Sequence, residues 1–204
     1  MNKEMYDLAA WSVETAKAAG ADNCRVGIHK QRSVEIGYRQ REPENIKEAS
    51  ARGLYIDVFA AGRYSRQSTS DLRKDTLQEF ISNAVRTTKL LAEDRSRTLP
   101  EPKYYADRSN LDLQILDPAY DQFTPQDRHN MVKAIEESCL GEGGDKAISV
   151  TAGEGDVHGE SVTLTSNGFQ GYREATMYWA GAEMTARDAG DRRPQGDYYV
   201  RVVA

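Results

Sequence analysis

The sequence predicts an α+β fold: an antiparallel meander sheet covered by two helices, followed by a second α+β lobe with a helix and long antiparallel strands. Two observations lead to this fold. Stretches with the two-residue period of a half-buried strand follow one another from 24 to 67 with no helix between them, which favours antiparallel pairing. Amphipathic stretches with the helical period stand before and after this block.

The first domain is expected to span residues 1–100 and to begin with a helix at 3–19. Gly20 is well placed to end that helix. Its buried face collects the apolar residues Met5, Leu8, Ala9, Val13 and Ala16. Alternating apolar residues then predict strands at 24–30 and 33–39, and a more polar third strand at about 45–52.

A hairpin joined to a helix start is expected next. Leu54, Ile56 and Val58 alternate with more polar neighbours, the turn falls at Ala61-Gly62, and a second short strand runs over 63–67. The four side chains that follow, Ser68, Thr69, Ser70 and Asp71, can all accept hydrogen bonds from free backbone N–H groups. They are expected to cap the next helix, and contact with a peptide or ligand is the alternative.

That helix is predicted over 74–92, and the proline-bearing stretch 99–102 marks the end of the first domain. One wide apolar stripe, which should cover a face of the sheet, contains Leu77, Phe80, Ile81, Ala84, Val85, Thr88 and Leu91.

The second domain is expected to span 101–204, opening with an extended crossing segment at 103–123. A third helix then begins, with Thr124 as its N-cap, Pro125 in the first helical position and Asp127 in the first turn. Gly141 and the Gly143-Gly144 pair should end it. The predicted buried residues of this helix are Met131, Val132, Ile135 and Cys139.

Strands are predicted to return after the third helix, at 147–151, 157–166 and 171–187. Asn167-Gly168 between the last two is a strong hairpin signal. A polar loop and a strand at 198–203 complete the chain. The aromatic residues Tyr172, Tyr178 and Trp179 fall on one long strand and are candidate peptide or interface contacts, although core packing is the commoner role of such residues.

Composition excludes several classes of partner. The net charge is −5 with no concentrated basic stripe, so direct nucleic-acid binding is not expected. No apolar run approaches the roughly 18 to 20 residues that cross a bilayer, so neither is membrane binding. The N-terminus lacks the apolar core of a signal peptide, and Cys24 and Cys139 have no metal or redox spacing, so we expect reduced thiols and a cytoplasmic location.

Motifs for chemistry are scarce. The three histidines, His29, His129 and His158, belong to no metal-binding pattern and are expected to be structural or solvated. The glycine-rich pieces at 141–144 and 153–155 contain glutamates and no following lysine, so they are interpreted as turns rather than phosphate loops. An acidic cluster is expected to be a solvated face rather than a cation site; it contains Glu136, Glu137, Glu142 and Asp145. We therefore assign no catalytic, cofactor-binding or metal-binding residue.

An ordered set of short motifs resembles the TldD/PmbA family, whose members are sometimes labelled modulators of DNA gyrase. The main block runs from Gly53 to Leu72 and is followed by an amphipathic helix. Similar pieces occur in the expected order over nearly the whole chain: Gly20-Ala21-Asp22, Glu93-Asp94, Leu99-Pro-Glu-Pro102, Leu116-Asp117-Pro118 and Ser166-Asn-Gly-Phe169. Ser68 to Leu72 is closer to the PmbA branch, also called TldE. Tyr55 and Arg73-Lys74 depart from the family pattern.

The resemblance implies the noncatalytic N-terminal region of a PmbA/TldE-like subunit in an intracellular metalloprotease assembly that processes peptides. In this family the metal, zinc or another divalent ion, is held in the TldD-type subunit by an H-E-x-x-x-H motif and a later cysteine. No residue of this chain matches those ligands, so we expect no cofactor in the chain and no activity by the chain alone. Implied partners are a TldD-like subunit, or a second copy of the protein, and a peptide substrate.

Two other functions remain open. One is a regulatory module that binds partner proteins, in gyrase or toxin modulation, without proteolysis. The other is the N-terminal part of an active TldD-like metallopeptidase. Family members are more than twice as long as this chain, so we expect it to be an N-terminal portion, cut before the C-terminal domain.

Overall fold

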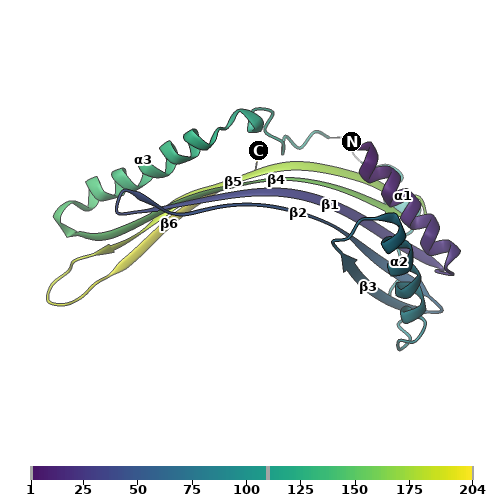
Figure 1. Ribbon diagram of the computed structural model, residues 1–204. Helices are drawn as coiled ribbons and strands as arrows, with labels where there is room; N and C mark the ends of the chain where they lie inside the picture. The colour runs from purple at the N-terminus through teal and green to yellow at the C-terminus, as the bar shows by residue number, and fades with distance from the viewer. Residues whose placement is uncertain (1, 109–110, 204) are drawn as a thin grey trace. The chain divides into compact units, whose positions relative to one another are not determined.

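The computed structural model describes residues 2–108 and 111–203 and confirms the α+β class (Figure 1). Its strands form a six-stranded sheet in the order β3-β2-β1-β4-β5-β6. The elements, in chain order, are α1 Lys3–Ala18, β1 Asn23–Arg39, β2 Glu42–Ala60, β3 Arg63–Thr69, α2 Lys74–Thr88, α3 Pro125–Gly143, β4 Ala147–Thr165, β5 Gln170–Ala186 and β6 Gln195–Val203.

Several strands are longer than predicted. The strands expected at 24–30 and 33–39 are one strand, β1, and the polar strand at about 45–52 is continuous with the first arm of the hairpin in β2. Those expected at 147–151 and 157–166 also form one strand, β4, so the turn predicted at 153–155 is wrong. Polar and glycine residues interrupt the apolar alternation in these places, yet the backbone stays extended because the neighbouring strands supply its hydrogen bonds.

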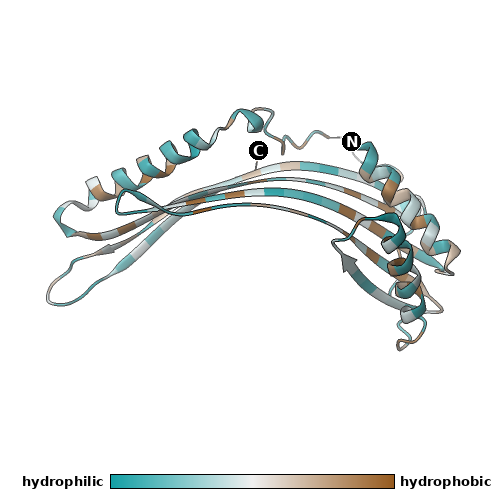
Figure 2. Ribbon diagram, in the orientation of Figure 1, coloured by the Kyte–Doolittle hydropathy of each residue, from teal (hydrophilic) through white to brown (hydrophobic). Residues whose placement is uncertain are grey.

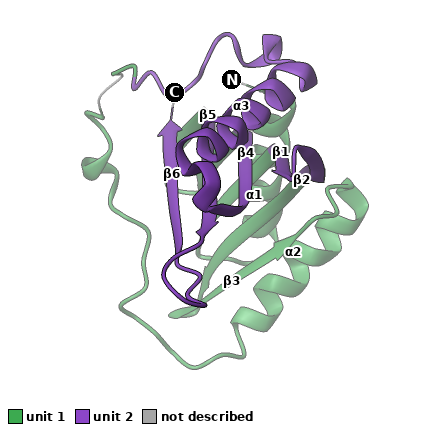
Figure 3. Ribbon diagram, turned by 90° about the vertical axis from the view of Figure 1, so that its left-hand side faces the viewer, with its two compact units in different colours: residues 1–30, 51–112, 160–173 green, residues 31–50, 113–159, 174–204 purple. Residues whose placement is uncertain are grey.

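The chain divides into two compact units (Figure 3). Unit 1 contains residues 1–30, 51–112 and 160–173, and unit 2 contains residues 31–50, 113–159 and 174–204. The units interleave along the sequence, because the long strands contribute residues to each of them. The proposed domain division at about residue 100 is a division along the chain and stays a prediction.

Unit 1 has α1 and α2 on its part of the sheet, and its apolar core includes the predicted alternation of Leu54, Ile56 and Val58. The hairpin turn lies at Ala61-Gly62 as predicted, with β2 and β3 paired in antiparallel register from Leu54↔Thr69 to Ala60↔Arg63. The buried face of α1 matches the prediction in Met5, Ala9, Val13 and Ala16. Hydrophobic and hydrophilic residues alternate along the strands, as expected of a half-buried sheet (Figure 2).

The entrance and the end of α2 differ from the prediction. The N-cap residue is Arg73, whose side chain makes no capping hydrogen bond, and of the predicted tetrad Asp71 accepts from the backbone N–H of Arg73 at the helix entrance. The helix ends at Thr88, and Leu91, predicted to belong to the buried stripe, is 42% exposed. The chain leaves the helix one turn earlier because Leu90 and Leu91 donate to the carbonyls of Thr87 and Thr88 in tight turns.

Unit 2 has α3 on its part of the sheet, packed on a small apolar core that includes Val34, Ile36, Val132 and Val150. The start of α3 is as predicted. Thr124 Oγ1 accepts from the backbone N–H of Asp127, and the Asp127 carboxylate accepts from the backbone N–H of Thr124, which is a complete capping box. Met131, predicted to be buried, is 41% exposed, since α3 turns Val132 to the sheet and Met131 to one side.

Replacing Thr124 by alanine should lower the free energy of unfolding by about 1 kcal/mol, because the N–H of Asp127 loses its acceptor. Urea denaturation followed by circular dichroism measures this change. Gln126→Ala in the same turn serves as the matched control, because its side chain is exposed and donates to the exposed Asn130. Equal effects of the two substitutions would show that the capping box adds nothing.

The crossing segment before α3 is irregular where it is described, with short 3₁₀ turns at Pro102–Tyr104 and Tyr120–Gln122. Residues 109–110 of that prediction lie outside the described residues. No helix in the described parts of the chain is both long and apolar enough to pass through a lipid bilayer.

Candidate functional site

Unit 2 buries a set of charged and phenolic side chains between α3 and the sheet. Arg128 is in the first turns of α3 and is 2% exposed, and Asp156 of β4 is fully buried beneath it. Arg128 Nε donates to Asp156 Oδ2 over 2.5 Å, and the Tyr120 hydroxyl donates to Asp156 Oδ1 over 2.5 Å. Arg128 Nη1 also donates to the carbonyl of Phe123, whose ring lies 4.5 Å from the guanidinium carbon. Each oxygen of the Asp156 carboxylate therefore accepts a hydrogen bond.

Glu154 lies on the same face of β4, two residues before Asp156, but in the described part of the chain its Oε1 atom lacks such a donor. It is 1% exposed, and Glu154 Oε1 is 3.9 Å from Arg128 Nε, beyond hydrogen-bond distance. Among the described residues, neither Glu154 Oε1 nor Arg128 Nη2 has a hydrogen-bond partner. Buried polar atoms without a partner are rare in folded proteins and are costly, so this position is a candidate for a bound group.

The titration of Glu154 follows from this burial. Removal from water raises the pKa of the Glu154 carboxyl to about 7, the negative charge of Asp156 acts in the same direction, and Arg128 opposes both. Burial and the hydrogen bond to Asp156 raise the pKa of Tyr120 to about 12, so that phenol stays protonated. Glu154 is thus divided between its neutral and ionised forms at neutral pH.

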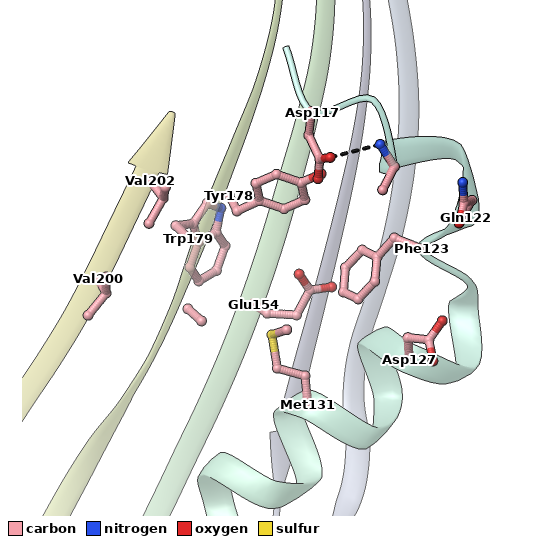
Figure 4. Close-up of a pocket in the computed structure, with 12 residues that line it drawn as sticks. Asp117, Gln122, Phe123, Asp127, Met131, Glu154, Tyr178, Trp179, Val200 and Val202 are labelled. Atoms are coloured by element: carbon pink, nitrogen blue, oxygen red, sulfur yellow. Dashed lines mark hydrogen bonds between the residues drawn. The ribbon is translucent and has the colours of Figure 1, made fainter. Parts of the chain in front are cut away.

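A cavity of about 520 Å³ opens beside Glu154, within the size range of small-molecule and side-chain pockets (Figure 4). Its wall is contributed by the crossing segment, α3, β4, β5 and β6. The lining residues are Asp117, Ala119, Gln122, Phe123, Asp127, Met131, Glu154, Tyr178, Trp179, Ala180, Val200 and Val202. Most of this wall is apolar, and its ionisable acids are Asp117, Asp127 and Glu154.

The two other acids at the cavity have the opposite titration behaviour. The backbone N–H of Ala119 and the hydroxyl of Tyr178 donate to Asp117 and lower its pKa. The hydroxyl and N–H of Thr124 lower the pKa of Asp127 in the capping box. Both carboxylates are therefore ionised at neutral pH, and the cavity presents a negative rim around an apolar interior.

An open sheet edge lies next to this cavity. Among residues 2–108 and 111–203, β6 is the last strand of the sheet order, and it pairs with β5 from Met177↔Val203 to Thr185↔Gln195. Large apolar side chains on β6 are exposed, namely Tyr198, Tyr199, Val200, Val202 and Val203. An edge strand offers unpaired backbone groups to another extended chain, and apolar neighbours make such pairing more favourable.

The three aromatic residues that the sequence predicts as peptide or interface contacts belong to different units. Tyr178 and Trp179 both line the cavity of unit 2, and the indole of Trp179 also packs over Gly153 and Gly155 of β4. Tyr172 belongs to unit 1, where it packs against the apolar core and donates to Glu160 Oε1 over 3.1 Å. The edge of β5 beside Tyr178 and Trp179 is occupied by β6, so peptide pairing would have to use β6 instead.

The polar tetrad of unit 1 forms a local turn. Thr69 Oγ1 accepts from the backbone N–H of Asp71, and the Asp71 carboxylate accepts from the backbone and the guanidinium of Arg73. These hydrogen bonds lower the pKa of Asp71. A cavity of about 300 Å³ lies close by and is lined by Leu72 and Arg73, but Ser68, Thr69, Ser70 and Asp71 are not in its wall. A contact role for the tetrad stays a prediction.

Other sequence candidates have structural partners. His129 Nδ1 is 3.0 Å from the Tyr38 hydroxyl, and His158 Nε2 is 3.0 Å from Glu174 Oε1. Glu136 of the acidic cluster is 1% exposed rather than solvated, because both of its oxygens accept from the backbone N–H of Arg41. Within residues 2–108 and 111–203, no three His, Cys, Asp or Glu side chains are grouped as metal ligands.

Sequence reasoning missed Arg128, Glu154 and Asp156. The signal was present in Gly153-Glu-Gly-Asp156, in which two carboxylates alternate with two glycines. In a strand that spacing places both acids on one face and both glycines on the other. The same composition is typical of turns, which is why it was interpreted as one.

Comparisons with known proteins agree with this fold. The family model described as "PmbA/TldA metallopeptidase central domain" matches residues 118–203, which include most of the cavity wall. A crystal structure from Bacteroides thetaiotaomicron, described as "a putative modulator of DNA gyrase", is 30% identical over 99% of this chain, with a TM-score of 0.93. Comparison with curated proteins gives no significant match.

Two more distant structures share the fold alone. One from Thermotoga maritima has the same kind of description (14% identity, TM-score 0.79), and the other is TldE from Thermococcus kodakarensis (15% identity, TM-score 0.78). Each aligns with 97% of this chain, and the chain spans 43% of each and 46% of the Bacteroides protein. The matched central domain and the shared fold agree with the resemblance of the ordered motifs to the TldD/PmbA family.

Proposed function

We propose that this chain is the noncatalytic N-terminal region of a PmbA/TldE-like subunit, working in a TldD/PmbA-type metalloprotease assembly that processes peptides. The central-domain match at 118–203 and the likeness to TldE in fold support the proposal. The observation that carries it is the open edge of β6, with its exposed apolar side chains. Such an edge is suited to an extended peptide or to a strand of another subunit.

In this role the catalytic metal, zinc or another divalent ion, belongs to the TldD-type partner. The present chain supplies a wall along which a peptide is held extended by backbone hydrogen bonds. Backbone pairing does not depend on the side chains of the peptide, so it accommodates many peptide sequences. Specificity for particular side chains must come from neighbouring pockets. The location proposed for the assembly is the cytoplasm, and its simplest form is a heteromer of the two subunit types.

The test uses the protein at its full natural length together with a TldD-type subunit. We expect cleavage of an unstructured fluorogenic peptide only when both subunits are present, and loss of cleavage when a chelator is added. Cleavage by the full-length protein alone would contradict the noncatalytic role. Binding of a partner protein without any cleavage would favour the regulatory module instead.

An edge variant refines this test. Tyr198 on β6 is 74% exposed, and Tyr198→Lys places a charge where an incoming strand would pair, which opposes strand addition. We expect at least a tenfold loss of partner-dependent cleavage. Tyr104→Lys, in the 3₁₀ turn of unit 1, is the matched control because Tyr104 is equally exposed and lies far along the sequence. Equal activities of the two variants would exclude a role of the β6 edge in partner-dependent cleavage.

A further inference from the structure

The cavity of unit 2 has the charge of a cation site. Three carboxylates, Asp117, Asp127 and Glu154, are in its wall, and no lysine, arginine or histidine is among the residues that line it. Asp117 and Asp127 are held in the ionised form by donors from Ala119 and Thr124. An anionic ligand would be repelled by this wall, whereas a cation would be attracted.

A residue that lines this cavity has a buried acceptor without a partner. Glu154 Oε1 has no hydrogen bond among the described residues, although the residue is 1% exposed and lines the cavity. Figure 4 shows its carboxylate between the rings of Tyr178 and Phe123. The positive charge of Arg128 is bound over 2.5 Å to Asp156. With Glu154 ionised, this buried trio carries one surplus negative charge.

The remaining walls fit an aliphatic chain that ends in a cation. Met131, Ala180, Val200 and Val202 offer apolar surface, and Phe123 and Tyr178 offer aromatic rings, which attract ammonium groups. A metal ion is less suited, because several oxygen ligands would have to converge on it, and the described residues contain no such group. A long amine can bury its methylenes and place its charged head at an acid.

We propose that this cavity binds a primary alkylammonium group, as carried by a lysine side chain, with its NH₃⁺ donating to the Glu154 carboxylate and its methylenes packed on the apolar wall. The proposal depends on unit 2 alone and does not require the peptide-processing role. If both hold, the site gives the assembly a preference for lysine beside the strand held at the β6 edge.

The affinity of the cavity for an amine should depend on pH. The groups that face Glu154 are Arg128 of α3, Asp156 of β4, Tyr178 of β5 and the rim acids Asp117 and Asp127. Because its carboxyl has a pKa of about 7, Glu154 must release its proton to pair with an ammonium group. Between pH 6 and pH 8 the ionised fraction rises about tenfold, so affinity should rise by about the same factor while the amine stays protonated.

The experiment titrates the chain with n-butylamine and follows the Met131 methyl resonance of a ¹³C-methyl-methionine sample by NMR. We expect a saturable shift with n-butylamine at pH 8 and about tenfold weaker binding at pH 6. n-Butanol, which has the same chain and no charge, should bind at least tenfold more weakly than n-butylamine at pH 8. Equal binding of the two, or no pH dependence, would overturn the proposal.

Variants and a second ligand sharpen the result. Glu154→Gln should weaken n-butylamine binding at least tenfold, whereas Glu137→Gln, on the exposed side of α3, should not. If Glu154→Gln does not fold, the comparison with n-butanol and the pH dependence still decide. Nα-acetyl-lysine N-methylamide should bind and its Nε-acetyl form should not; failure of the lysine compound would reject the peptide ligand. An absence of cleavage in the assembly assay would not change these amine-binding results. The amine-binding proposal and the peptide-processing proposal can therefore be rejected independently.

Discussion

Replacing Arg128 by methionine is expected to lower the free energy of unfolding by about 3 to 5 kcal/mol, the usual cost of removing one partner from a buried ion pair. Arg128 is the cation that matches Asp156 and lies near Glu154, and both acids are almost fully buried. Without it two carboxylates face each other in the interior with no positive charge. Chemical denaturation at pH 7.5 measures the loss.

The pH dependence gives this prediction a second readout. Loss of Arg128 removes the charge that opposes the raised pKa of the Glu154 carboxyl, so the folded state then binds more protons than the unfolded state. Stability of the variant should therefore rise as pH falls toward the unfolded pKa of a carboxyl, about 4, and fall as pH increases. Adding Glu154→Gln and Asp156→Asn to Arg128→Met should restore part of the lost stability.

Lys133→Met is the matched control, because Lys133 lies on the exposed side of the same helix and pairs with exposed Glu137. Its effect should stay within about 0.5 kcal/mol. A loss of less than 1 kcal/mol for Arg128→Met, or one that does not change with pH, would show that the buried acids do not depend on this arginine.

Replacing Gly155 by valine is the second large effect that we expect. A Cβ at this position would lie 2.8 Å from Cζ2 of Trp179 and closer still to its Nε1. The rigid indole must swing away, and the free energy of unfolding should fall by about 1 to 3 kcal/mol.

Fluorescence can follow Trp179 if the other tryptophan, Trp11, is first replaced by phenylalanine. The emission of Trp179 should move to longer wavelength in Gly155→Val, because the ring becomes more exposed to water. Gly196→Val on β6 is the control, since nothing lies within 4 Å of a Cβ there. Unchanged emission and stability in Gly155→Val would mean that the ring is not held on this glycine.

Local sequence signals predicted the structure well where the determining contacts are local. The start of α3 depends on Thr124, Pro125 and Asp127, which are neighbours in sequence, and the capping box is present as expected. The hairpin turns at Ala61-Gly62 and Asn167-Gly168 were likewise predictable, because a left-handed backbone there suits the residues: φ is 68° at Gly62 and 101° at Gly168.

Features that depend on distant contacts were not predictable. β2 continues through its polar first half, where both faces are exposed, because its neighbours in the sheet hold it extended. Gly153 and Gly155 leave room for a tryptophan from the next strand, which no local pattern reveals. Glu154 is buried only because α3 and the crossing segment cover it. The candidate site therefore combines two residues that the sequence nominated, Tyr178 and Trp179, with an acid that it did not.

Hydrogen–deuterium exchange of β6 is the most direct test of the claim that this chain binds peptides or a partner subunit at its open edge. The full-length protein would be measured alone, with a TldD-type subunit, and with that subunit and a peptide substrate. We predict that backbone amides of 195–203 exchange quickly in the protein alone and become protected in the assembly. Active, chelator-sensitive cleavage with unchanged exchange in β6 would contradict the account.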